Sequence, residues 1–204
     1  MGRDELDLAQ APSVVHKVVD ACLVARRATA SWFDPWAMPA GFDPTALVKG
    51  WAARRTMEAL RHGGISAAMV NAGGDIVVVG EPRPAPCWRI AIVDPHRADH
   101  LLGSVALPVS EWPWTIATSG RYERGEHLLD PHTGTASEGD VAAATVTGPD
   151  LARAAALATA LAEAPSSESA TWTVPGYDWL LVHNDGTRSG ALLDALDPGV
   201  GALA

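Results

Sequence analysis

The segment ATSGRYERGEHLLDPHTG, residues 117–134, concentrates side chains that could do chemistry. Its hydroxyls, arginines and backbone amides can hold a phosphate group, and its first histidine can move a proton near neutral pH. Its aspartate and second threonine add hard oxygen atoms, the ligands that Mg²⁺ prefers. Because a purely solvated loop rarely gathers all of these groups, the segment predicts a binding site for a charged ligand. The residues concerned are Thr118, Ser119, Gly120, Arg121, Arg124, His127, Asp130 and Thr133.

Two further stretches offer backbone amides to an anion. FDPTALVKG places amides at a helix start, where a phosphate can sit, and puts Lys49 in the second turn of the same helix. In NAGGD, residues 71–75, Gly73 and Gly74 let the backbone approach a ligand closely. Each stretch also has a plainer interpretation, as a capped surface helix and as a hairpin turn. The sequence lacks the Gly-x-Gly-x-x-Gly pattern of a Rossmann dinucleotide site.

The sequence predicts two helices in its first third. Apolar residues recur at helical spacing over residues 13–30, where Ser13 is the expected N-cap. Asp43 and Pro44 predict the start of a second helix, because Asp caps free amides and Pro fits the first helical position. The glycines at residues 63–64 are expected to end it.

The rest of the chain predicts short strands and one more helix. Residues 65–81 are expected to form a strand, a glycine turn and a second strand. An alanine-rich helix is expected from about residue 150 to residue 164, with Thr159 as a small polar residue on it. Because strands and helices do not alternate regularly, the pattern favours an α+β fold over a doubly wound sheet. Other expected strands cover residues 87–94, 104–109, 114–118 and a run ending near 147, and a last hairpin turns at residues 184–186.

The composition of the chain indicates a globular protein and limits the kinds of partner that it can bind. At 204 residues, with 48% hydrophobic and 19% charged residues, the chain is expected to form a single domain over residues 1–190, followed by a weakly ordered tail over residues 191–204. The net charge of −9 argues against a nucleic-acid partner, since binding to phosphate backbones depends on Lys and Arg. Cys22 and Cys87 are expected to be free thiols. Because the sequence shows neither a membrane span nor an export signal, the expected location is the cytoplasm.

Four motifs, taken in order, resemble those of the ApbE family, the FAD:protein FMN transferases. They are FDPTALVKGWA, VNAGGDI, ATSGRYERGEHLLDPHTG and VTGPDLARAAALATAL, and the resemblance runs from about residue 30 to residue 164. It implies an α+β, T-fold-like architecture with a mixed or antiparallel sheet and flanking helices. It also implies a Mg²⁺-dependent reaction that moves the FMN half of FAD onto a threonine or serine hydroxyl of a flavoprotein and releases AMP.

The same resemblance assigns roles to individual residues. His127 corresponds to the histidine expected to assist proton transfer from the accepting hydroxyl. The backbone of Ala46 and the hydroxyl of Thr159 correspond to ligands of the metal. The expected FAD-binding residues are Lys49, Gly73, Gly74, Thr118, Ser119, Gly120, Arg121, His127, Asp130 and Thr133.

Two departures from the family pattern leave alternatives open. Relatives usually carry an aspartate four residues before the metal-binding threonine, where this sequence has Ala155, so a lower Mg²⁺ affinity is expected. Relatives also carry further residues before the first motif, including a strand, and an open sheet edge there would invite a homodimer. The alternatives to the transferase are a protein that binds FAD without turnover and a pyrophosphatase that splits FAD into FMN and AMP.

Overall fold

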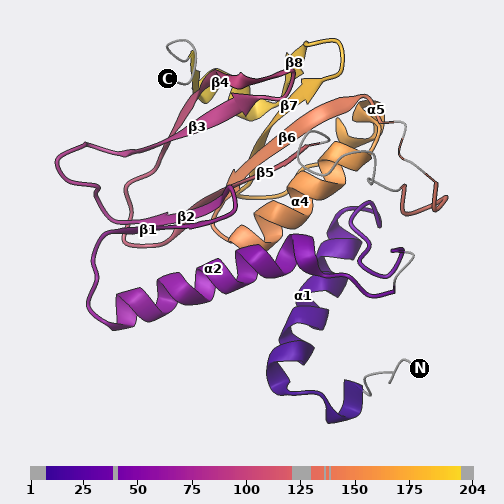
Figure 1. The fold of residues 1–204 in the computed structure, drawn as a ribbon, viewed down its shortest axis with the longest axis horizontal. Helices are drawn as coiled ribbons and strands as arrows, with labels where there is room; N and C mark the ends of the chain where they lie inside the picture. The colour runs from indigo at the N-terminus through magenta and orange to yellow at the C-terminus, as the bar shows by residue number, and fades with distance from the viewer. Residues whose placement is uncertain (1–7, 39–40, 121–129, 136, 138, 199–204) are drawn as a thin grey trace.

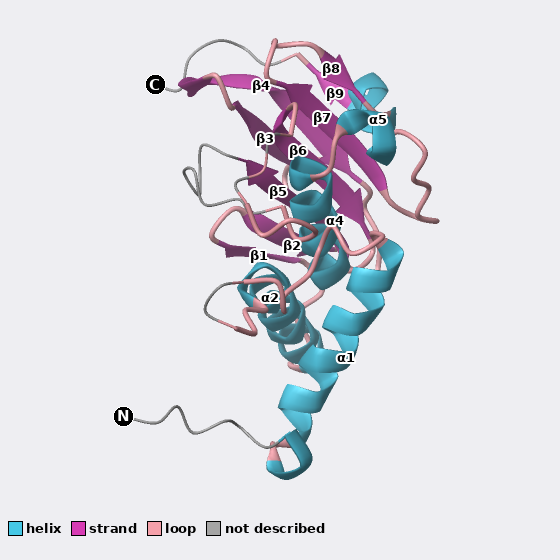
Figure 2. Ribbon diagram, turned by 90° about the vertical axis from the view of Figure 1, so that its right-hand side faces the viewer, coloured by secondary structure: helices cyan, strands magenta, loops and turns pink. Residues whose placement is uncertain are grey.

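The computed structural model describes residues 8–38, 41–120, 130–135, 137 and 139–198, and these form three layers (Figure 1). A six-stranded sheet lies in the middle, and helices cover one of its faces (Figure 2). A three-stranded sheet packs against the other face. Every strand pair in both sheets is antiparallel, so the expected α+β class with flanking helices is confirmed.

The six-stranded sheet has the strand order β1-β2-β5-β6-β7-β8. β6 is buried along its whole length, as expected for a central strand that is covered on both faces. β1 and β8 form the two edges. The bounds are β1 (Ala68–Ala72), β2 (Asp75–Val79), β5 (Trp114–Gly120), β6 (Val141–Gly148), β7 (Asp178–His183) and β8 (Arg188–Ser189).

The three-stranded sheet has the order β3-β4-β9. It is built on the long antiparallel pair of β3 (Trp88–Asp94) and β4 (Arg97–Leu107), whose register shifts near Val93. β9 (Leu196–Asp197) adds two residues to the free side of β4. The strand expected at residues 104–109 is therefore the second half of a longer one.

Three long helices lie on the other side of the central sheet. They are α1 (Ser13–Ala28), α2 (Thr45–His62) and α4 (Leu151–Glu163), and α5 (Ser166–Ser169) and the 3-10 turns η1 (Leu8–Gln10) and η3 (Ala191–Ala195) are short. The Asp150 side chain caps α4 by accepting the backbone N–H of Arg153 at 3.0 Å. Ser13 is the first helical residue of α1, not its N-cap: Pro12 holds the cap position and no side chain caps this helix.

The alternation of side chains along the central strands divides the core into two parts. Along β2, Val77 and Val79 face the helices and pack with α4. Ile76 and Val78 face the other way and pack against the three-stranded sheet. A third cluster joins α1 to α4 through Cys22 and the alanines of α4. The many alanines of α4 therefore let it pack between the sheet on one side and two helices on the other.

The end of the described chain differs from the expected weakly ordered tail. Residues 191–197 form η3 and β9, and Leu192 is buried in the core between the two sheets. Pairing with β4 supplies partners for the backbone of Leu196 and Asp197. Such contacts with residues far away in the sequence leave no mark in a local pattern, which is why the sequence alone predicts a weakly ordered chain end.

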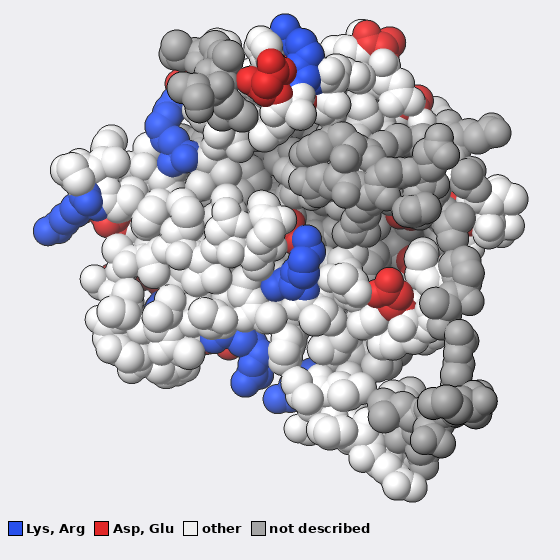
Figure 3. All heavy atoms as spheres, viewed as in Figure 1, with Lys and Arg blue, Asp and Glu red and all other residues white. Residues whose placement is uncertain are grey.

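Charged side chains of both signs are scattered over the face in Figure 3, among uncharged residues. A few Lys and Arg lie close together below its centre, and the described residues show no continuous basic surface on that face. Within the described ranges, no helix combines the length and the apolar character needed to cross a bilayer.

Candidate functional site

Lys49 and the glycine turn, which are 24 or more residues apart in the sequence, meet in the structure. The Lys49 Nζ atom lies 3.1 Å from Oδ2 of Asp75, the first residue of β2. The lysine side chain is 38% exposed, whereas the Asp75 side chain is buried. The carboxylate therefore holds the ammonium group in place, and part of the lysine side chain is open to solvent.

The turn between β1 and β2 provides an open stretch of backbone next to this ion pair. Gly73 and Gly74 both have positive φ angles, of 65° and 92°, which favour glycine. The Asn71 Oδ1 atom accepts the N–H of Gly74 at 2.9 Å and so fixes the turn. Apart from its two chain neighbours, no described residue has an atom within 4 Å of a methyl group added at Gly73, so the described chain leaves the backbone there open to a ligand.

A second pair of site residues meets between β5 and α4. The hydroxyl oxygens of Ser119 and Thr159 lie 3.1 Å apart, and both residues are buried. Because side chains alternate along a strand, Ser119 faces the helix layer together with Ala117. The sequence expectation that these two hydroxyls belong to one site is consistent with this contact.

Thr118 lies on the opposite face of the sheet from Ser119. Its hydroxyl oxygen is 2.9 Å from that of Thr145 on β6, at a directly opposed position in the register. Its side chain therefore does not join the Ser119–Thr159 pair. Gly120 is the buried last residue of β5 and pairs with Ala143. Of the three consecutive residues predicted to line one pocket, only Ser119 directs its side chain toward α4.

Asp130 and Thr133 form a tight turn of their own. The Asp130 carboxylate accepts the backbone N–H groups of His132 at 2.7 Å and Thr133 at 3.4 Å. Although slight burial alone would raise the pKa of Asp130, these hydrogen bonds lower it below its ordinary value, so the group stays ionised. The ring of His132 packs edge-on against Trp32 at 4.7 Å and anchors the turn to the segment after α1.

The start of α2 offers fewer free amides than its sequence suggests. The carboxylate of Asp43 accepts the N–H of Thr45 at 2.9 Å, and the carbonyl of Pro44 accepts two more amides of the first turn. Pro44 occupies the N-cap position and not the first helical position. Ala46, the predicted metal ligand, is buried against the alanines of α4, and its carbonyl points along the helix toward the amide of Gly50.

Three of the residues singled out in the sequence lie outside the described residues. They are Arg121, Arg124 and His127, so the predicted catalytic histidine stays a prediction from the sequence. The described part of the site joins Lys49 to the glycine turn and Ser119 to Thr159. Both pairs involve the layer formed by α2 and α4 against the central sheet.

Two neighbours of the predicted residues were missing from the predicted site. Asp75 holds Lys49, and its position directly after the two glycines was the available signal. Gly50 lets α2 approach α4, because a Cβ atom there would lie 2.6 Å from the carbonyl oxygen of Leu151. Its position directly after Lys49 was the corresponding signal. Neither contact could be assigned from local sequence, since both join elements that are far apart in the chain.

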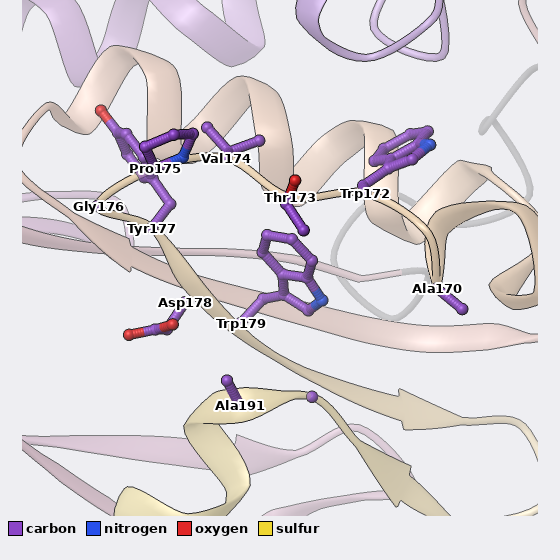
Figure 4. A pocket seen from close by; sticks show the side chains of 11 residues that line it. Ala170, Trp172, Thr173, Val174, Pro175, Gly176, Tyr177, Asp178, Trp179 and Ala191 are labelled. Atoms are coloured by element: carbon purple, nitrogen blue, oxygen red, sulfur yellow. The ribbon is translucent and has the colours of Figure 1, made fainter.

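A separate hollow lies away from these residues, between the segment before β7 and η3 (Figure 4). Figure 4 shows the indole of Trp179 below Thr173, with Asp178 directed to one side. Its lining is mostly apolar and contains none of the residues predicted to bind FAD or metal. The hollow is therefore distinct from the candidate site.

Comparison with known proteins now decides the family. The sequence model of the ApbE family matches residues 37–177, which is more than half of the chain. The chain belongs to the ApbE family. The matched region includes both residue pairs described above.

Two curated relatives in the ApbE family carry the name FAD:protein FMN transferase. The protein from Treponema pallidum is 30% identical over 161 residues, which cover 70% of this chain and 44% of that protein. The protein from Vibrio cholerae is 32% identical over 127 residues, which cover 58% of this chain and 37% of that protein. The chain thus matches less than half the length of these relatives.

Solved ApbE structures share the fold. The ApbE protein from Thermotoga maritima superposes with a TM-score of 0.77 at 20% identity, covering 93% of this chain and 79% of that one. The flavin transferase ApbE from Vibrio cholerae gives a TM-score of 0.71 at 21% identity, covering 88% of this chain and 74% of that one. These similarities confirm the ApbE-type α+β fold expected from the motifs.

The described residues do not fit a resident Mg²⁺ ion of the kind that the family resemblance implies. Ala155 offers a methyl group to the core in place of a carboxylate, and the Thr159 hydroxyl is already bonded to Ser119. Within the described ranges, no group of three or more His, Cys, Asp or Glu side chains could hold a metal ion. Because Mg²⁺ gives up its water reluctantly and is usually held through one or two carboxylates, hydroxyl and helix carbonyl oxygens alone are a poor site.

Proposed function

We propose that this protein is a flavin transferase that uses FAD as donor and a threonine or serine hydroxyl of a flavoprotein as acceptor. The observation that carries the proposal is the Lys49–Asp75 pair beside the open Gly73 backbone, in a chain of the ApbE family. A fixed ammonium group and a stretch of main chain that a ligand can approach closely suit the binding of a diphosphate. The names of the curated relatives support FAD as the diphosphate.

The proposed reaction is a phosphoryl transfer. The acceptor hydroxyl oxygen forms a bond to the phosphorus of the FMN half, and the bond from that phosphorus to the bridging oxygen breaks. AMP leaves with the bridging oxygen, and the FMN becomes linked to the acceptor through a phosphoester. The hydroxyl proton leaves during the attack, and His127 is the proposed acceptor for it. Lys49 would offset negative charge on the diphosphate. No step through Mg²⁺ is included, since the described residues do not fit the ion.

The test is an incubation of the protein with FAD and a peptide or domain that carries an acceptor threonine. We expect AMP to accumulate and the acceptor to gain the mass of FMN, and we expect His127→Ala to abolish both products. AMP and free FMN without labelled acceptor would instead identify a FAD pyrophosphatase. If the chain binds FAD but forms neither product, that result would rule out catalysis.

Binding of FAD without turnover is the second candidate function. Ala155 favours it, because an alanine in the apolar core cannot supply the carboxylate that relatives are expected to carry. Under this alternative, FAD raises the melting temperature by mass action but no AMP forms. The same incubation therefore distinguishes the two functions.

We also propose a homodimer formed through the free edge of β1. The pairing of Ala72 with Asp75 across a two-residue turn directs the backbone groups of Met69 and Asn71 away from β2. Among the described residues, no strand pairs with that side of β1. Residues 64–72 contain no charged residue and no proline that would block edge pairing.

A further inference from the structure

The positive charge in the described part of the site comes from one lysine. Lys49 is one of only two lysines in the sequence, and its Nζ atom is fixed at 3.1 Å from Asp75. The buried carboxylate neutralises part of that charge, but an ammonium group has three N–H donors and this side chain is partly exposed, so hydrogen bonds to phosphate oxygens remain available. The open backbone at Gly73 begins two residues away from Asp75.

The helix α4, which packs against α2, carries no acidic side chain over most of its length. Residues 151–162 of α4 read LARAAALATALA, without an aspartate or glutamate. The nearest carboxylates on either side belong to Asp150, which pairs with Arg54, and to Glu163, which is buried. Ala155, one helical turn before Thr159, is only 4% exposed and packs among apolar residues.

A divalent cation and a lysine can each neutralise the negative charge of a bound diphosphate, but they need different protein groups. Mg²⁺ bridges phosphate oxygens to protein carboxylates, so it needs an acidic ligand on the protein. A lysine neutralises the phosphate directly and needs none. The described residues supply the second arrangement through Lys49. For the first arrangement, α4 offers no carboxylate between residues 151 and 162, and the Asp75 carboxylate is paired with the lysine itself.

We infer that this chain binds the diphosphate of FAD through Lys49 and the neighbouring backbone, so that its FAD affinity does not depend on a divalent metal ion. The inference rests on the proposed function insofar as FAD is the ligand. It concerns affinity, and it holds for the transferase and for the non-catalytic alternative alike.

The test is a titration of the purified full chain with FAD, followed by flavin fluorescence or calorimetry, once in excess Mg²⁺ and once in EDTA. We expect the two dissociation constants to agree within about twofold. An affinity that rises about tenfold or more with Mg²⁺ would overturn the inference while leaving the proposed function intact. No FAD binding in either condition would overturn the proposed function as well.

Charge variants test the role of the lysine. We expect Lys49→Ala to weaken FAD binding in EDTA by about tenfold or more, as for the loss of a charge-assisted phosphate contact. Lys17→Ala is the matched control, because it removes the same charge from an exposed position on α1. Equal affinities for wild type and Lys49→Ala would contradict the inference.

A gain-of-function variant tests the missing carboxylate. We expect Ala155→Asp to make FAD affinity respond to Mg²⁺ and to bind Mn²⁺ detectably by electron paramagnetic resonance, whereas wild type and Ala155→Asn do not. Detectable Mn²⁺ binding by wild type at the same concentration would count against the inference. If Ala155→Asp fails to fold, the comparison of wild type in Mg²⁺ and in EDTA still decides.

Discussion

The Thr159 side chain connects α4 to β5. Its hydroxyl lies 3.1 Å from that of Ser119, and both groups are buried. A buried hydroxyl that loses its partner retains the cost of leaving water, about 1–3 kcal/mol. This pair therefore links the stability of α4 on β5 to the predicted binding site.

We predict that Thr159→Val lowers the free energy of unfolding by about 1–3 kcal/mol, because Ser119 loses its hydrogen-bond partner. Chemical denaturation followed by circular dichroism measures this change. Thr56→Val is a suitable control, since its hydroxyl contacts only the carbonyl of Ala52 on the exposed side of α2. An unchanged stability of Thr159→Val would show that the Ser119 hydroxyl finds another partner.

At the scale of elements, the contact between α2 and α4 depends on the absence of a side chain. A Cβ atom at Gly50 would lie 2.6 Å from the carbonyl oxygen of Leu151 and 2.9 Å from the nitrogen of Ala152. Backbone atoms of a helix start cannot move aside without moving the helix. The approach of the two helices places Lys49 at the edge of the glycine turn.

We predict that Gly50→Ala costs about 1–3 kcal/mol of stability, the usual range for overpacking, despite the higher helix propensity of alanine. We also expect weaker FAD binding, because the shift of α2 moves Lys49 away from Asp75. Gly63→Ala is the matched control: it lies at the end of the same helix, and its nearest contact is 3.3 Å. A melting temperature of Gly50→Ala at or above that of wild type would contradict the described packing.

At the scale of the whole molecule, a buried thiol and a buried phenol make the stability of the fold depend on pH in the alkaline range. Burial raises the pKa of the Cys22 thiol from 9.0 to about 11. Burial, together with the charge of Asp150, raises the pKa of the Tyr177 phenol from 10.0 to about 12. Both groups are neutral when protonated, so the folded state favours the protonated form.

The sign of the pH dependence follows from these shifts. Well below pH 9 both groups are protonated in the folded and unfolded chain, and their contribution to stability is complete. As the pH rises from 9 to about 11 for Cys22, and from 10 to about 12 for Tyr177, the unfolded chain releases protons that the folded chain keeps, so stability falls. We expect the urea midpoint to decrease over this range, and to decrease less steeply in the Cys22→Ala, Tyr177→Phe double variant. Equal slopes for both proteins would contradict the assignment to these two groups.

The proposed homodimer also belongs to this scale. We predict that Met69→Lys shifts the protein from dimer to monomer in light scattering coupled to size-exclusion chromatography, because two lysines would face each other across the paired edges. Val109→Lys is the control, since Val109 is exposed but lies in the loop after β4. A wild-type protein that is monomeric at all concentrations would refute the dimer.

The sequence by itself determined the elements that depend on near neighbours. The glycine turn between β1 and β2, the Asp150 cap of α4 and the hairpin after β7 follow from turn and cap chemistry within a few residues. The order of the four motifs predicted the ApbE family, which the family match confirms. These features required no knowledge of which strands pair.

Only the tertiary structure decided which of these groups meet. It placed Lys49 against Asp75, and Ser119 against Thr159 across 40 residues, while Thr118 faced the other side of the sheet. It also placed η3 (residues 191–195) beside β7, with Leu192 in the core, and paired Leu196 and Asp197 with β4. The physical reason is that such contacts depend on strand register and on the close approach of helices, which arise from packing between segments far apart in the chain.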